Sequence, residues 1–444
     1  MLDIFSIQRT VEKNFPYFGI NKKNEIIRLL YEISKKEKIN FLKITRDLKG
    51  RDFSFIKKIL LERRYPYTLL KEKEPRFYLP ILDIQPENKL RIKKFKLYPK
   101  KIYFEKETED LSLLKRFKRF FPRAEFIQIE TLKDYLKAHG YTLKDYNLRK
   151  ESFFIVKEKY DFLKNCPCTK DALNCGYSIL NLGFGCPYEC IYCYLQEYTD
   201  SAGIIFSGNL EDFFRYFKKF KRSSKLRIGS GEFTDSLFLD DITQYSVELI
   251  NFFRDYPDIY FEFKTKSKNI DFLLNAKSSK NIVISWSLNP QKIIKECEFY
   301  TADLKERIVS AVKCIEAGFK VGFHFDPIIY YEGWQYDYKE LLNYLFDKIK
   351  EDSILWISLG TLRFNPRLKK IIENRFPENK ILDEELILGF DGKLRYPKEI
   401  RFNIYKKMLE FIRKRAKHLW VYLCMEERVI WQALKEFGIS MKNV

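Results

Sequence analysis

Histidine is scarce in this chain: His139, His324 and His418 are the only three among 444 residues. None of them belongs to an HExxH motif, and the sequence also has no P-loop and no GxGxxG fingerprint. The motifs therefore give no support to zincin catalysis, to nucleotide hydrolysis at a Walker loop or to Rossmann dinucleotide binding. His324 falls at the end of a predicted strand, but a lone histidine is more often structural, so we leave it outside the predicted site.

Long apolar runs are absent as well. No stretch approaches the ~18 apolar residues of a membrane helix, and the residues after Met1 do not form an apolar targeting segment. The nine cysteines are odd in number and clustered, which favours metal ligation in a reducing compartment over a disulfide framework. We therefore expect a cytoplasmic protein without a membrane partner.

Acidic residues are outnumbered, with 61 Asp and Glu against 82 Lys and Arg and a formal net charge of +21. Such an excess favours polyanionic partners, because Lys and Arg contacts to phosphates contribute salt-dependent affinity. A chain rich in Lys, Ile and Phe and poor in Ala also arises from genome base bias or from a hot habitat. Charge alone leaves both interpretations open.

The most informative residues are Cys186, Cys190 and Cys193, which follow Gly185 with the spacing C-x3-C-x2-C. Three thiolates this close on one loop can ligate three irons of a 4Fe-4S cluster. The fourth iron is then left for S-adenosylmethionine (SAM), whose amino and carboxylate groups can chelate it. The pattern predicts reductive cleavage of SAM to a 5′-deoxyadenosyl radical, chemistry that the cofactor carries and the protein directs.

A zinc site is the alternative, since zinc takes four ligands that commonly come as paired CxxC or Cys/His units. The nearest further ligands are Cys166, Cys168 and Cys175, three cysteines within ten residues. This trio is also a candidate for an auxiliary cluster, a structural metal or a hydrogen-atom donor, and we name Cys175 as the candidate catalytic thiol. The remaining cysteines lie in apolar surroundings and are predicted to be inert core thiols: Cys297, Cys314 and Cys424.

Strands and helices alternate from Cys175 onward, which indicates parallel strands joined by crossover helices. Six strands favour an α/β fold with a partial, TIM-like (β/α)6 barrel, in which functional residues gather at the carboxyl ends of the strands. The cysteine loop follows the first of these strands. They are predicted at 177–183, 226–231, 258–265, 281–288, 320–326 and 354–361.

The chain is expected to divide into four segments. They are a helical N-terminal domain (1–95), a small α/β lead-in (96–165), the barrel (166–375) and a C-terminal hairpin with an α/β extension (376–444). The lead-in has predicted strands at Lys101–Glu105 and Glu125–Ile129 and predicted helices at Leu111–Phe120 and Thr131–His139.

The N-terminal domain has apolar residues at helical spacing over Asn24–Lys35 and Phe53–Arg64. Between these two helices lies Lys36–Arg51, which is dense in Lys and Arg and contains Gly50 as a break. Two short helices with a basic connector are compatible with a helix-turn-helix. A small helical cap on the barrel is the other interpretation.

The loop Cys186–Gln196 (CPYECIYCYLQ) resembles the cluster loop of the spore photoproduct lyases, which are radical-SAM enzymes of DNA repair. The likeness covers roughly residue 97 to the C-terminus and leaves the first ninety or so residues outside. It implies a lyase-like radical-SAM enzyme with a 4Fe-4S cluster, SAM, a reductant of the ferredoxin or flavodoxin type and a nucleic-acid substrate. The stretches that continue the likeness are Thr265-Lys266, Ala317-Gly318 with Gly322 and Asp326-Pro327, Glu332-Gly333-Trp334, Asp391–Tyr396 and Tyr422–Glu426.

Candidate SAM contacts lie at the ends of the second and third strands. Gly231-Glu232 resembles the Gly-Gly-Glu motif of many radical-SAM enzymes, in which glycine allows close backbone approach and a carboxylate can bind the SAM ammonium. Thr234 is a candidate for the ribose or the substrate, and Lys266 for the SAM carboxylate. A tight turn with a solvated Glu232 and an ordinary surface lysine are the alternatives.

Four further residues take predicted roles from the resemblance. Tyr192 and Tyr194 flank the last cluster cysteine, a pair that the family is thought to use to relay the radical; packing against the loop is the alternative. Arg395 and Tyr396 belong to a predicted hairpin that turns at Asp391-Gly392. The resemblance implies that this hairpin inserts at a DNA lesion, whereas a solvated hairpin is the simpler interpretation.

The chain departs from the family at Glu232, which occupies the position of the hydrogen-donating cysteine of spore photoproduct lyase. No cysteine lies between Cys193 and Cys297, and a glutamate O–H bond is too strong to quench a carbon radical. We therefore expect a paralogue that starts radical chemistry on a pyrimidine lesion or another base in DNA. The alternatives are the same machinery acting on a non-DNA substrate, and a non-enzymatic, basic nucleic-acid-binding protein with a structural metal.

Overall fold

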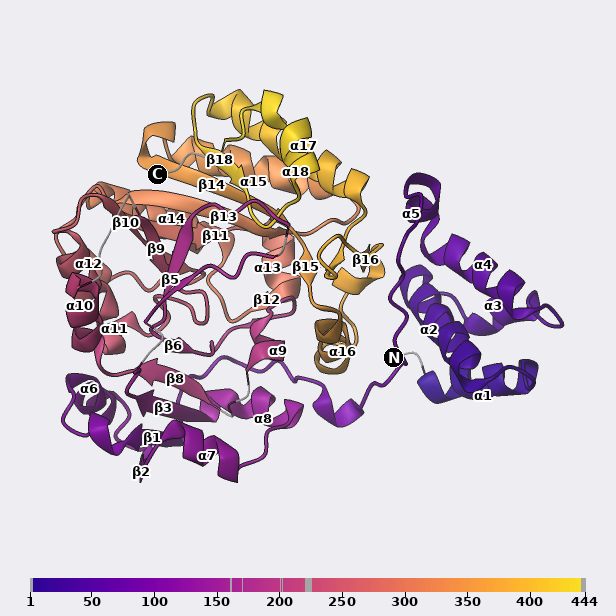
Figure 1. Cartoon of the computed structure of the whole chain (residues 1–444), viewed down its shortest axis with the longest axis horizontal. Helices are drawn as coiled ribbons and strands as arrows, with labels where there is room; N and C mark the ends of the chain where they lie inside the picture. The colour runs from indigo at the N-terminus through magenta and orange to yellow at the C-terminus, as the bar shows by residue number, and fades with distance from the viewer. Residues whose placement is uncertain are drawn as a thin grey trace. The chain divides into compact units, whose positions relative to one another are not determined.

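The computed structural model describes residues 3–159, 162–169, 171–199, 201, 203–219 and 226–440. They form two compact units (Figure 1). The helical unit comprises residues 1–90 and 362–404, and the barrel unit comprises residues 91–361 and 405–444. This division differs from the four expected segments. The lead-in shares one unit with the expected barrel up to residue 361, whereas residues 362–375 belong to the helical unit, and the expected C-terminal segment is split between the two.

The barrel unit is built around an eight-stranded sheet with the order β18-β14-β13-β11-β10-β9-β5-β4. Seven strands are parallel to their neighbours, and β4 (Leu163–Asn165) pairs antiparallel with β5 at one edge. The sheet contains all six predicted strands and so confirms the predicted partial barrel. The parallel strands are β5 (Tyr177–Leu180), β9 (Leu226–Ser230), β10 (Ile259–Thr265), β11 (Ile282–Ser287), β13 (Lys320–Ile328), β14 (Ile354–Thr361) and β18 (Val421–Leu423).

The central strands are rich in apolar residues because both of their faces are covered. In β11 every residue is buried, and Val283, Ile284 and Trp286 are fully inaccessible. The seventh parallel strand, β18, was not predicted, because three residues are too few for a periodic signal. The helices between and after the strands are α10 (Leu210–Lys219), α11 (Asp240–Thr243), α12 (Tyr245–Phe253), α13 (Gln291–Cys297), α14 (Leu304–Glu316), α15 (Trp334–Lys348), α17 (Lys398–Arg415) and α18 (Arg428–Ala433).

A second sheet of five strands, β2-β1-β3-β8-β6, belongs to the same unit. Its strands β1 (Lys101–Glu105) and β2 (Glu125–Ile129) coincide with the two predicted lead-in strands, and α6 (Ser112–Phe120) and α7 (Leu132–Ala138) confirm the predicted helices. The short strand β6 lies just before the cysteine loop and pairs with β8. The remaining elements here are α8 (Leu143–Leu148), β3 (Ser152–Val156), β6 (Gly183–Phe184) and β8 (Ile204–Ser207).

The helical unit gathers its N-terminal helices around α2 (Figure 1). The predicted helix Phe53–Arg64 coincides with α4, which begins after Asp52, whose side chain accepts from the backbone N–H groups of Ser54 and Phe55. A short helix, α3, lies inside the predicted connector. The five helices are α1 (Ile4–Asn14), α2 (Ile20–Glu37), α3 (Phe41–Arg46), α4 (Phe53–Arg64) and α5 (Pro66–Lys71).

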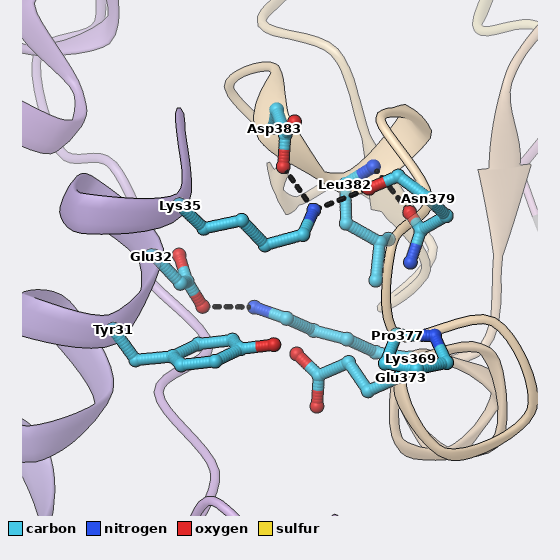
Figure 2. A pocket seen from close by; sticks show the side chains of 9 residues that line it. All are labelled: Tyr31, Glu32, Lys35, Lys369, Glu373, Pro377, Asn379, Leu382 and Asp383. Atoms are coloured by element: carbon cyan, nitrogen blue, oxygen red, sulfur yellow. Dashed lines mark hydrogen bonds and ion pairs between the residues drawn. The ribbon is translucent and has the colours of Figure 1, made fainter. Parts of the chain in front are cut away.

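Residues 362–404 belong to the helical unit, and one buried and one partly exposed ion pair tie them to α2. Lys369 Nζ donates to Glu32 Oε1 at 2.7 Å, and Lys35 pairs with Asp383, at a small pocket shown in Figure 2. Breaking a buried pair such as Glu32–Lys369 by removing one partner costs about 3–5 kcal/mol, so this contact holds the segment to the helices. The segment contains β15 (Arg363–Phe364), α16 (Pro366–Arg375), β16 (Ile387–Leu388) and β17 (Leu394–Arg395).

No helix among the described residues is both long enough and apolar enough to cross a membrane.

Candidate active site

The cysteine loop lies between the two sheets of the barrel unit and is fixed at several points. Gly185 has a φ of +95°, which favours glycine, and its N–H donates to the Phe233 carbonyl in the loop after β9 at 2.9 Å. Within the loop, β7 (Glu189–Cys190) pairs antiparallel with β12 (Glu298–Phe299). The N–H of Cys193 closes a turn on the Cys190 carbonyl at 3.0 Å.

The three loop thiols share one electrostatic environment. Burial raises the pKa of Cys186, and the nearby Asp235 and Cys193 add to the rise. Burial also raises the pKa of Cys190, where the Lys266 ammonium works against it. Buried thiols that repel one another as thiolates need positive charge, which iron ions bound in place of the thiol protons provide. The donor set therefore fits an iron–sulfur cluster.

Arg149, which sequence reasoning missed, holds the backbone of the loop from the lead-in. Its fully buried guanidinium donates to the carbonyl of Cys186 at 2.9 Å and to that of Tyr188 at 2.7 Å. It also pairs with the buried Glu189 carboxylate at 2.8 Å. Because Arg149 is 37 residues from Cys186 in the chain, no local pattern could have shown this contact.

Gln196, the last residue of the quoted motif, fixes the other end of the loop. Its buried side-chain amide donates to the carbonyls of Cys190 at 3.2 Å, Ile191 at 2.8 Å and Cys193 at 3.0 Å. Three backbone carbonyls of the loop are thereby bound by a side chain of the same loop. The loop is preorganised for ligation.

Tyr192 points toward a buried polar network at β12. Its hydroxyl donates to Glu298, and the Asn289 amide donates to the same carboxylate at 2.9 Å. Arg307 from α14 pairs with the other Glu298 oxygen at 2.6 Å. Burial raises the pKa of Tyr192 well above its usual value, and the Glu298 charge adds to the rise. The network keeps this phenol protonated.

Tyr194 points in another direction, toward the end of β9. Its hydroxyl donates to the backbone carbonyl of Glu232 and lies 3.2 Å from Glu232 Oε1. Lys264 Nζ is 3.8 Å from the other carboxylate oxygen. Glu232, predicted as a SAM contact, is thus a partly buried carboxylate between a phenol and an ammonium, and is not a solvated turn residue.

Gly231 is required where it stands. Its φ is +88°, and a Cβ there would lie 2.5 Å from the Lys264 carbonyl oxygen and 2.5 Å from Ser236 Oγ. The loop after β9 therefore approaches β10 more closely than any other residue would allow.

Asp235 connects the ends of β9 and β10. Its carboxylate accepts from Thr265 Oγ1 at 2.6 Å and from the Lys266 N–H at 2.7 Å. Thr234 lines a small cavity beside it, together with Phe206 and Tyr245. The predicted SAM contacts Gly231, Glu232, Thr234 and Lys266 consequently all lie at the carboxyl ends of these neighbouring strands.

The upstream cysteines also approach this region. A hydrogen bond with Cys168 and burial raise the pKa of Cys166, and the Glu232 charge contributes to the rise. Cys175 is close enough to Cys166 and Arg227 for their charges to affect its pKa, which burial raises. Among the described residues, no group of three His, Cys, Asp or Glu side chains is placed to hold a single metal ion, so the auxiliary metal stays a prediction.

The predicted lesion-binding pair lies in the helical unit. The hairpin is present, with β16 pairing antiparallel with β17 and Gly392 at the turn with a φ of +75°. Arg395 and Tyr396, however, are fully buried, and Arg395 Nη2 pairs with Asp391 at 2.6 Å. The structure thus places neither side chain where it can stack on a base, and Arg395 instead braces the hairpin against its own turn.

His324, left outside the predicted site, is a buried partner of Glu262. Its Nε2 is 2.7 Å from the Glu262 carboxylate, which also pairs with Arg227 at 3.0 Å and accepts from the Trp356 indole at 3.0 Å. Burial lowers the pKa of His324. This polar cluster inside the sheet has a structural role.

Comparison with known proteins agrees with these features. Curated spore photoproduct lyases of Clostridium acetobutylicum, Geobacillus sp. and Bacillus subtilis are 28%, 32% and 31% identical over 221, 212 and 208 residues. The matches cover 49%, 46% and 45% of this chain and 66%, 62% and 61% of the relatives, so less than two thirds of each relative's length.

Solved structures share the fold. One of a spore photoproduct lyase complexed with dinucleoside spore photoproduct is 23% identical, with a TM-score of 0.64, and the match covers 74% of this chain and 99% of that one. A mutant of spore photoproduct lyase gives 24% identity and a TM-score of 0.65, covering 74% and 100%. The family model described as spore photoproduct lyase matches residues 82–416, well over half of the chain. The chain belongs to the spore photoproduct lyase family.

Proposed function

We propose that this chain is a radical-SAM enzyme that acts on a pyrimidine lesion or another base in DNA. The observation that carries the proposal is the preformed loop with Cys186, Cys190 and Cys193, set beside the carboxyl ends of barrel strands. The names of the relatives support it, since they are spore photoproduct lyases and one solved neighbour is described with bound AdoMet and dinucleoside spore photoproduct. The net charge of +21 also suits a polyanionic substrate.

The three loop cysteines would hold a 4Fe-4S cluster, and Gly231, Glu232, Thr234 and Lys266 would face SAM. When bound, the cluster supplies the electron that cleaves SAM and starts radical chemistry. The chain's own contribution is to hold the loop through Arg149 and Gln196 and to provide the Lys266 charge, which favours the thiolate of Cys190. A reductant of the ferredoxin or flavodoxin type would deliver the electron.

One of the upstream thiols, Cys166, Cys168 or Cys175, donates the hydrogen atom that Glu232 cannot donate. Cys166 is favoured over Cys175, because Cys166 interacts electrostatically with both Glu232 and Tyr194, and its raised pKa keeps its S–H bond intact. A hydrogen atom would pass from Cys166 Sγ to the substrate carbon radical and leave a thiyl radical. One electron from the reductant and one proton would restore the thiol, with Tyr194 as the relay.

The proposal is tested by anaerobic reconstitution of the purified chain with iron and sulfide. The protein is then incubated with SAM and dithionite, and 5′-deoxyadenosine is quantified. The wild type should hold iron and cleave SAM, whereas Cys190→Ala should lose both properties. Cys314→Ala is the matched control, since this thiol is buried in α14 away from the loop. Zinc in place of iron, or equal cleavage by Cys190→Ala, would overturn the proposal.

The substrate and the donor are tested together with DNA that contains spore photoproduct, in D2O. We expect the repaired thymine to carry deuterium from an exchangeable thiol, and Cys166→Ser to lose this label while it still cleaves SAM. Cys175→Ser and Cys314→Ser test the runner-up and the background. An unchanged label in Cys166→Ser would exclude this donor. SAM cleavage without turnover of the lesion would favour the second candidate function, in which the enzyme acts on a non-DNA substrate. The observation that favours this candidate is Glu232, which stands at the position of the family's hydrogen-donating cysteine.

A further inference from the structure

The helical unit presents a basic face that the catalytic proposal does not use. We define the α3–α4 face by six exposed side chains on α3, on α4 and on the turn between them, in which Gly50 has a φ of +73°. Arg46 has a side-chain exposure of 80%, and Phe55 is 40% exposed despite its size. The six residues are Lys43, Arg46, Lys49, Arg51, Phe55 and Lys58.

Other cations of α4 have acidic partners on α2. Lys57 lies 2.7 Å from Glu25, and Arg64 lies 2.8 Å from Glu32, so these side chains hold α4 against α2. Further contact comes from Ile56, which is fully buried in the same core. The inward side of α4 is therefore satisfied by its own unit.

The cations of the α3–α4 face are paired weakly or not at all. Within the described part of the chain, Lys43 and Lys49 have no acidic partner within 4.0 Å. Arg46 reaches only its neighbour Asp47, at 3.6 Å and with both side chains exposed. Exposed pairs of this kind contribute little to stability, so the charges are available to an external polyanion.

The shape of the face narrows the choice of polyanion. Arg51 lies over the Phe55 ring, 5.2 Å from its centroid, at the exposed start of α4. Besides Asp47, the face has Asp52 as a nearby carboxylate. Asp52 caps the N-terminus of α4 and accepts from the Ser54 N–H at 2.9 Å. A short helix, a tight turn and a second helix with an exposed outer side is the arrangement that places a helix in the DNA major groove while flanking cations contact phosphates.

We infer that the α3–α4 face binds double-stranded DNA, with the outer side of α4 toward the major groove and Lys43, Lys49 and Arg51 on phosphates. The face lies before residue 82, where the match to the family begins. It would therefore contact DNA in addition to the contact that the proposed active site makes. The inference rests on the proposed function only for the choice of DNA, and the binding itself requires neither cluster nor lesion.

The test measures fluorescence anisotropy of a short, undamaged DNA duplex with the full chain at several salt concentrations. The variant is Lys43→Ala/Lys49→Ala/Arg51→Ala. Each phosphate contact contributes about 0.9 to the slope of log K against log salt, so the slope should become less steep by about 2.7. The control, Lys277→Ala/Lys280→Ala/Lys305→Ala, removes three exposed lysines of the barrel unit and should bind as the wild type does.

Equal binding by the variant and the wild type, or equal loss in the variant and the control, would overturn the inference. The inference would also be overturned if the triple variant lost binding only to single-stranded RNA or only to anionic vesicles. Unchanged circular dichroism of the variant excludes misfolding as the cause of a loss. SAM cleavage without DNA present should be unaffected in the variant, so a failure of the DNA-binding inference is distinguishable from a failure of the proposed radical chemistry.

Discussion

Arg149→Met should loosen the cysteine loop. Arg149 and Glu189 are both fully buried and lie 2.8 Å apart, and the substitution leaves Glu189 in place. Removing one partner of a buried pair costs about 3–5 kcal/mol, chiefly because an uncompensated charge stays buried. Lys150 Nζ remains 3.2 Å from the same carboxylate oxygen, so we expect the lower end of this range, about 3 kcal/mol.

The loss should be local, because the carbonyls of Cys186 and Tyr188 lose their donors at the same time. We expect faster hydrogen exchange in peptides that cover residues 186–196, and less iron bound after reconstitution. A second variant, Arg149→Met/Glu189→Gln, should recover part of the stability, since a neutral amide costs less to bury than an unpaired carboxylate.

Arg116→Met is the matched control. Arg116 also donates to backbone carbonyls, those of Ile242 at 2.8 Å and Thr243 at 2.7 Å, but it lies on α6 and does not contact the loop. If Arg149→Met binds as much iron as Arg116→Met, and its loop amides exchange no faster, then the loop does not depend on this guanidinium and the reasoning is wrong.

Three further predictions concern backbone, acid stability and the helical unit. Gly231→Ala should destabilise the barrel unit more than Gly176→Ala in urea unfolding. Both glycines have positive φ, of +88° and +73°, but only at Gly231 would the new Cβ clash with other atoms. Equal losses of stability in the two variants would contradict the clash. Glu298 is buried, which opposes ionisation, yet Arg307 and Lys266 lower its pKa to about 2 from an ordinary 4.5. A carboxylate whose pKa is lower in the folded than in the unfolded state stabilises the fold at pH values above its unfolded pKa. This stabilisation is lost as the pH falls through the folded pKa, so the free energy of unfolding should fall by about 3 kcal/mol from about pH 5 to about pH 2. Glu298→Gln should flatten this dependence, and an unchanged profile would refute the assignment. Glu373 lies 2.5 Å from Arg28 Nη1, and Arg28→Met should remove this partner. The local stability of the helical unit should then fall by about 3 kcal/mol. Hydrogen exchange should become faster in the helical unit and stay unchanged in the barrel unit.

Sequence reasoning placed the local features well. The six strands were found because strand-like and helix-like segments alternate along the chain, and the strand Ile282–Ser287 is buried along its whole length. Helix α4 was found with its observed bounds, since apolar residues recur at helical spacing over Phe53–Arg64. The cluster cysteines lie on one loop, so their spacing alone carries the chemical prediction.

Long-range packing decided the rest. The burial of Arg395 beside Asp391 could not be inferred from a hairpin motif, because the motif specifies the turn and not what covers it. The grouping of α2 with residues 362–404 depends on pairs such as Glu32 with Lys369, which lie 337 residues apart in the chain.

The sequence by itself determined the family-like cluster loop and the strand pattern that supports it, since both depend on residues close together in the chain. Only the tertiary structure brought Arg149 to the loop backbone and let the Glu232 charge act on the Cys166 thiol. Spacing and periodicity report which residues share a turn, a helix face or a strand. Which distant elements then meet depends on packing of the whole unit, and that packing positions the residues around the three thiols.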